Sequence, residues 1–212
     1  MDRKVVSYTS TNNYETLNRN TPYTENIWLV FHGIGYLSRY FIRHFSNLDP
    51  LKNYIIAPEA PSKYYLKDDY KYVGASWLTK EYTQREINNN FNYLDAIWAE
   101  ERINKDKKLV LFAFSQGVSI LLRWLAHSKV PCTEIILLAG SIPKELEQKD
   151  YLHLEKTKIK YVYGVNDQFI TAEKIMIEKE FMKTLFPNEV EVITFPGGHE
   201  IPKNWMQIVF NP

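Results

Sequence analysis

The sequence predicts a three-layer α/β fold with a mostly parallel central sheet, on two observations. Short runs of Val, Ile, Leu and Phe alternate along the chain with segments in which apolar residues recur at helical spacing. The runs are almost continuously apolar, which is typical of strands covered on both faces. Strands that alternate with amphipathic helices favour right-handed crossovers, with helices on both sides of the sheet.

Six apolar runs are the predicted parallel strands, over residues 27–31, 54–57, 109–114, 135–139, 159–165 and 190–195. The predicted helices cover residues 37–46, 83–103, 116–127, 171–185 and a last segment from Pro202.

Three further segments complete the expected fold. Residues 5–17 alternate around a Thr-Asn-Asn-Tyr turn, which predicts an antiparallel hairpin at the N-terminal edge of the sheet. Residues 59–80 are rich in Tyr and Lys without clear periodicity, so we expect a functional loop and the only candidate lid there. The connection over 139–158 is too short for a cap domain, and the site should therefore be fairly open.

Composition narrows the class of protein. With 212 residues, 24% charged and 45% apolar, we expect one globular domain over 1–212. Lys and Arg number 26 against 25 for Asp and Glu, so no global field favours nucleic acid as a partner. The single Cys132 excludes an intrachain disulfide and a multi-cysteine zinc site. The N-terminus shows no apolar leader, and no run nears the roughly 20 apolar residues of a membrane span, so a cytoplasmic location is expected.

Ser115 stands where a predicted strand passes directly into a predicted helix. The segment Ala113-Phe114-Ser115-Gln116-Gly117 has small residues two positions either side of the serine. This is the pattern of a nucleophile elbow, in which bulky flanking side chains would collide with the neighbouring backbone. A serine N-cap at an ordinary helix start gives the same local sequence. The pentapeptide alone leaves both interpretations open.

His32-Gly33-Ile34-Gly35 follows the strand predicted over 27–31. Glycines here let the backbone turn so that its N–H groups can face a developing oxyanion. A dinucleotide-binding turn is the alternative, but Ser38 occupies the place of the third glycine that close helix–sheet packing requires. We interpret His32 itself as a hydrogen-bonded structural histidine.

Two more junctions carry candidate catalytic side chains. Asp167 lies in Asn166-Asp167 after the strand predicted over 159–165, and His199 follows Gly197-Gly198 after the last strand. Each is weak evidence alone, because Asn-Asp is a common turn pair. Together, Ser115, Asp167 and His199 follow the nucleophile, acid and base order of α/β-hydrolases, each at the carboxyl end of a predicted strand.

From Asn26 to about Pro202 the chain resembles the phospholipase/carboxylesterase family of α/β-hydrolases, which includes acyl-protein thioesterases. The matching residues are Phe31-His32-Gly33-Ile34-Gly35, Ala57-Pro58, Ser76-Trp77, Phe114-Ser115-Gln116-Gly117, Asp167 and Gly198-His199. Two features depart from the family pattern. Ala113 replaces its usual glycine, and the Tyr-rich residues 64–72 replace a more Gly-rich stretch.

The resemblance implies a three-layer α/β-hydrolase fold and a role for each site residue. Ser115 would be the nucleophile, His199 the base and Asp167 the residue that orients it. The backbone N–H groups of Ile34 and Gln116 would bind the oxyanion.

The aromatic residues next to these junctions are the candidate substrate contacts. Tyr36, Trp77 and the residues 64–72 are expected at the edge of the site, the alternative being ordinary packing aromatics. The expected substrate is a small ester or thioester, with no metal and no organic cofactor. The rival functions are a non-catalytic binding protein on the same scaffold, and an acyl transferase or peptidase with the same triad. Oligomeric state is not predicted.

Overall fold

The computed structural model describes residues 1–104 and 106–210. All six predicted parallel strands are present, with bounds that differ by one residue at most. They are β2 (Asn26–Phe31), β3 (Asn53–Pro58), β6 (Lys108–Phe114), β7 (Glu134–Leu138), β8 (Lys158–Gly164) and β9 (Val190–Phe195). The sheet order is β1-β3-β2-β6-β7-β8-β9. Strands β2, β3, β6, β7, β8 and β9 pair in parallel, so their carboxyl ends share one edge of the sheet.

The N-terminal edge is antiparallel, as predicted, but it is formed differently. Strand β1 (Tyr14–Leu17) pairs with β3, with Leu17 opposite Ile55, and residues 1–13 contain no strand. The hairpin predicted within 5–17 is therefore wrong. The apolar strand β3 is a better partner than the exposed, polar residues before the turn.

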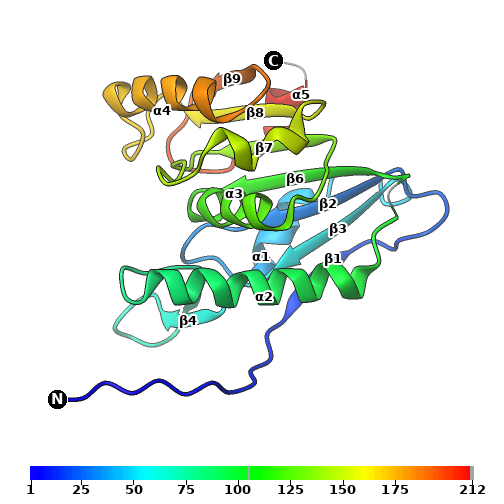
Figure 1. Ribbon diagram of the computed structural model, residues 1–212. Helices are drawn as coiled ribbons and strands as arrows, with labels where there is room; N and C mark the ends of the chain where they lie inside the picture. The colour runs from blue at the N-terminus through cyan, green and yellow to red at the C-terminus, as the bar shows by residue number, and fades with distance from the viewer. Residues whose placement is uncertain (105, 211–212) are drawn as a thin grey trace.

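Helices cover both faces of the sheet (Figure 1). They are α1 (Ser38–Phe41) continued by the 3₁₀ turn η1 (Ile42–Phe45), α2 (Thr83–Glu101), α3 (Gln116–Ser128), α4 (Ala172–Leu185) and α5 (Trp205–Phe210). The face with α1 and α5 is held by aromatic contacts, the Phe45 and Trp205 rings lying 5.2 Å apart. Two further 3₁₀ turns, η2 (Gln148–Asp150) and η3 (Leu152–Leu154), lie between β7 and β8. Every predicted helix is present.

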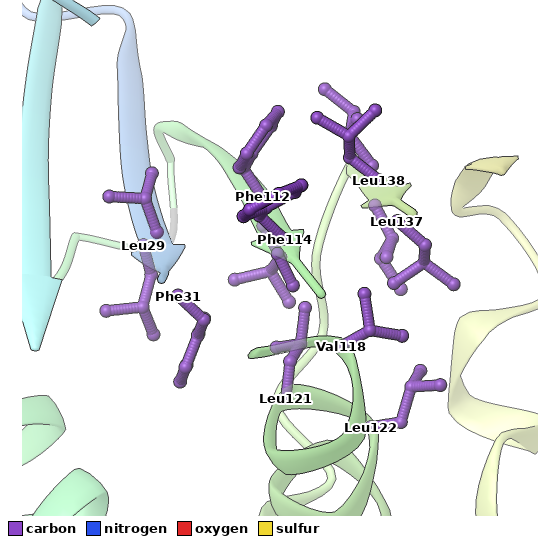
Figure 2. Close-up of a cluster of buried hydrophobic side chains, with 14 of the residues drawn as sticks. Leu29, Phe31, Phe112, Phe114, Val118, Leu121, Leu122, Leu137 and Leu138 are labelled. Atoms are coloured by element: carbon purple, nitrogen blue, oxygen red, sulfur yellow. The ribbon is translucent and has the colours of Figure 1, made fainter. Parts of the chain in front are cut away.

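The core lies against α3, the helix that begins at Ser115. Figure 2 shows Val118, Leu121 and Leu122 of this helix facing the strand side chains of the core. All three are fully buried, and so are Phe31 and Phe112 of the central strands. Burying such side chains stabilises the fold by roughly 1.5–3 kcal/mol each. The position of Ser115 is thus fixed by fully buried side chains of the core.

Residues 59–80, predicted as a loop, contain a second sheet. Strands β4 (Ser62–Tyr65) and β5 (Val73–Ser76) form an antiparallel hairpin. All four β4 residues are exposed, whereas Gly74, Ala75 and Ser76 are buried. The hairpin lacks the apolar alternation that predicts a strand, because β4 is exposed and the buried residues of β5 are small.

Candidate active site

Ser115 lies in the strained turn between β6 and α3. Its φ is 53° and its ψ −120°, a region that non-glycine residues rarely adopt. The turn is held by the Ser115 N–H, which donates to the Leu138 carbonyl oxygen at 2.9 Å. A Cβ at Gly117 would lie 2.5 Å from the Phe31 carbonyl oxygen, so only glycine fits there. The backbone has the form of a nucleophile elbow rather than of an ordinary helix start.

His199 reaches Ser115 from the loop that follows β9. Its Nε2 lies 2.8 Å from the Ser115 Oγ, and its Nδ1 lies 2.8 Å from Asp167 Oδ2. The Asp167 side chain is fully buried, and that of His199 is 19% exposed. The other Asp167 oxygen accepts a hydrogen bond from the Phe169 N–H at 2.8 Å. The structure thus brings the three predicted side chains into one hydrogen-bonded chain.

The loops after β8 and β9 are bonded to each other, which places Asp167 beside His199. The Asn166 N–H donates to the Gly197 carbonyl oxygen at 2.9 Å, and the Val165 N–H donates to that of Phe195 at 3.0 Å. A Cβ at Gly164 would collide with the backbone of Gly197. Glycines at this junction therefore let the two loops approach closely enough for the acid to reach the base.

Ile34 and Gln116 supply the candidate oxyanion donors. Within residues 1–104 and 106–210, neither backbone N–H donates to another protein group. The nearby turn is held by the Gly35 N–H, which donates to the Ala75 carbonyl oxygen, and by the Ala75 N–H, which donates to that of Tyr36. Two N–H groups kept free in this way suit an oxyanion hole.

The Gln116 side chain has a structural role that the sequence did not indicate. Its Oε1 accepts from the Trp77 N–H at 2.8 Å, and its Nε2 donates to the Leu78 carbonyl oxygen at 2.7 Å. Gln116 thereby joins the start of α3 to the end of β5. Such a contact depends on the position of the unpredicted hairpin, so it could not be found from local sequence.

His32 is buried and hydrogen-bonded, in agreement with the structural interpretation. The ring lies between the turn and the end of β3, with Gly33 and Ala60 as its partners. Burial lowers the pKa of this imidazole from its ordinary 6.5 to about 4. The ring is neutral at physiological pH.

Trp77 is buried beneath the candidate site. Its side chain is 1% exposed, it packs against His32 at 5.1 Å between ring centroids, and its Nε1 donates to the His32 carbonyl oxygen. Trp77 therefore belongs to the hydrophobic core and not to the exposed edge of the site where we expected it, and its contact with substrate stays a prediction. Tyr36 is half-buried and lies edge-on to Phe114, and burial raises the pKa of its hydroxyl. Tyr36 remains a candidate contact.

Other apolar side chains surround the site. The Phe169 ring lies edge-on to His199 at 4.8 Å and is 55% exposed, whereas Phe114 covers the imidazole from within at 5.1 Å. Ile34 is 54% exposed. Sequence reasoning did not single out Phe169, although its place two residues after Asp167 is a usable signal.

Surface pockets are found away from the candidate site. Two surface pockets of about 530 and 490 Å³ are lined partly by β9 residues, and neither includes Ser115, Asp167 or His199. Among the described residues, no three His, Cys, Asp or Glu side chains are grouped to hold a metal ion. In the same part of the chain, no helix has the length and apolarity to cross a membrane.

Comparison with known proteins places the chain in a family. The model of the phospholipase/carboxylesterase family matches residues 12–211. The chain belongs to this family. No curated protein matches the sequence.

Solved structures share the fold at low sequence identity. An acyl-protein thioesterase 2 from Zea mays is 15% identical with a TM-score of 0.72, and the match covers 94% of this chain and 96% of that one. A carboxylesterase from Bacillus cereus is 14% identical with a TM-score of 0.67, covering 94% and 95%. A phospholipase/carboxylesterase from Dyadobacter fermentans is 17% identical with a TM-score of 0.66, covering 97% of each chain. The fold is thus that of an α/β-hydrolase, and no separate cap domain is evident in the described residues. The family supports an esterase or thioesterase type of enzyme.

Proposed function

We propose that the protein is a serine hydrolase that cleaves small carboxylic esters or thioesters through an acyl-enzyme on Ser115. The observation that carries the proposal is the unbroken hydrogen-bonded chain from Ser115 through His199 to Asp167, with the serine at a strained strand-to-helix turn. An N-cap serine would need neither the positive φ nor the imidazole at 2.8 Å.

The geometry supports a two-step reaction. His199 Nε2 takes the Ser115 proton as Oγ attacks the carbonyl carbon, and then donates that proton to the leaving alcohol or thiol. A water molecule attacks the acyl-enzyme in the second step, again with His199 as base, and the acid is released. Asp167 holds Nδ1 protonated and stabilises the imidazolium that forms. The N–H groups of Ile34 and Gln116 bind the oxyanion in both steps.

Labelling with a fluorophosphonate tests this proposal. Wild-type protein and Ser141→Ala should be labelled on Ser115, whereas Ser115→Ala should fold normally and take up no label. Ser141 is the matched control because it is exposed and follows β7 at the same end of the sheet. An adduct on another serine would contradict the assignment of Ser115.

A substrate panel separates the rival functions. Esters and thioesters of several chain lengths should be hydrolysed, and EDTA should not reduce the rate because no proposed step needs a metal. Inactivity toward esters, thioesters and amides would favour the binding-protein alternative. Efficient acyl transfer to an added alcohol, or amide cleavage, would favour the transferase or peptidase alternative.

A further inference from the structure

His32 lies directly behind the turn that carries the Ile34 N–H. Its Nε2 accepts a hydrogen bond from the Ala60 N–H at 3.0 Å. An imidazole nitrogen that accepts carries no proton, so the neutral ring is protonated on Nδ1. That Nδ1–H donates to the Gly33 carbonyl oxygen, 2.7 Å away. The contacts of the ring therefore select one tautomer.

The Gly33 carbonyl and the Ile34 N–H belong to one peptide unit. In a trans peptide these two groups lie in one plane and point in opposite directions. A hydrogen bond that fixes the direction of the carbonyl therefore fixes that of the N–H. The Tyr36 N–H also donates to the Gly33 oxygen, but at 3.3 Å. The shorter bond comes from His32.

The His32 ring is held so that it cannot turn away from Gly33. It is fully buried, and it packs against Trp77 at 5.1 Å and Phe41 at 6.0 Å between ring centroids. Ala60, its second partner, follows Glu59, whose carboxylate accepts from the N–H and Oγ of Ser38 at the start of α1. Ala60 and Glu59 are thus bonded to His32 and Ser38, the two ends of the segment that carries Ile34.

We propose that His32 is a positioning residue that aims the Ile34 N–H at the oxyanion, an inference that rests on the proposed function. His32 does not touch the reacting atoms. It acts on the Gly33–Ile34 peptide plane through its Nδ1–H, and the Ala60 bond to Nε2 selects the tautomer that carries this proton. A change at His32 should therefore weaken binding of the transition state more than binding of the substrate.

Three substitutions separate the two ring contacts. His32→Asn keeps an amide N–H near the place of Nδ1 and loses the acceptor for Ala60. His32→Gln carries its amide out toward Ala60 and leaves the Gly33 oxygen without a side-chain donor. His32→Leu removes both. We expect kcat to fall on the order of 10²-fold in the Gln and Leu variants, as when one oxyanion donor is lost, with KM changed less than about threefold.

The Asn variant, which keeps the donor to Gly33, should retain most of the kcat that the Gln and Leu variants lose. Affinity for a boronic acid, which forms a tetrahedral adduct on the serine, should fall with kcat in each variant. His44→Leu is the matched control, because His44 is a half-buried histidine on the same aromatic cluster whose ring has no hydrogen bond within the described residues. That variant should lower the melting temperature and leave kcat unchanged.

The Asn and Gln variants decide the proposal even if His32→Leu does not fold. A kcat for Asn no higher than that for Gln would overturn it, and so would unchanged boronic acid affinity in the Gln variant. A wild-type protein that neither takes the fluorophosphonate nor hydrolyses any ester contradicts the proposed function itself. Normal labelling without the split between kcat and KM contradicts only the role of His32.

Discussion

At the scale of single residues, the three polar side chains of the site were predictable because each follows an apolar run directly. Ser115, Asp167 and His199 lie within four residues of the ends of β6, β8 and β9. Parallel strands bring such positions to one edge of a sheet. Contacts between loops were not predictable in this way. The Gln116 side chain finds its partners through the folded position of another segment, which no local pattern encodes.

Asp167→Asn tests the acid of the proposed triad. An amide can donate to Nδ1, which would leave the proton on Nε2 and make His199 unable to accept the Ser115 proton. We expect kcat to fall on the order of 10⁴-fold with the fold intact, as measured by steady-state kinetics and circular dichroism. Asp150→Asn is the control, because this carboxylate caps η2 and pairs with Lys129. A loss below about tenfold would identify a different acid.

At the scale of elements, the strands that the sequence predicted are apolar runs, and β2, β3, β6 and β7 are almost entirely buried. The β4–β5 hairpin was missed because four consecutive residues of β4 are exposed. Its role follows from β5 and the residues just after it, which are bonded to the turn that carries Ile34 and to the Gln116 side chain. Ala75 is bonded to the turn beside Ile34, and the Trp77 N–H and Leu78 carbonyl are bonded to the Gln116 side chain. The hairpin is therefore part of the site's framework.

Gly74→Ala should disturb that framework. A Cβ at Gly74 would lie 2.6 Å from the Gly35 carbonyl oxygen and 2.7 Å from its Cα, so the hairpin and the turn must move apart. We expect kcat to fall on the order of 10²-fold on every substrate, because one oxyanion donor is displaced. Val73→Ala, at the exposed preceding position, should keep its activity. Equal kcat in the two variants would show that β5 does not hold the turn.

At the scale of the whole molecule, the sheet order explains how distant segments meet. Ser115 is at the end of the central strand β6, and the other two polar side chains come from β8 and β9 on one side of it, while the Ile34 turn comes from β2 on the other. The order of elements along the chain predicted a parallel sheet. The pairing of β1 with β3 was not predictable, since the choice of an edge partner is decided by which surface remains uncovered after the sheet forms.

The stability of the whole protein should depend on pH through the burial of His32. Burial lowers the pKa of this imidazole from 6.5 to about 4, so between these values the unfolded chain binds a proton that the folded protein does not. This contribution to stability is complete above pH 6.5 and is lost as the pH falls toward 4. The loss lowers the free energy of unfolding by an amount on the order of 3 kcal/mol. Burial also lowers the pKa of His44, which adds a loss in the same direction.

Comparing wild-type protein with His32→Asn isolates the contribution of His32, because every other titrating group is common to both. Urea unfolding at pH 7 and pH 4.5 should show a smaller pH dependence in the variant. Equal dependence would mean that the His32 ring takes up its proton without unfolding. The imidazole would then not be held between Ala60 and Gly33, since a protonated Nε2 cannot accept the Ala60 N–H.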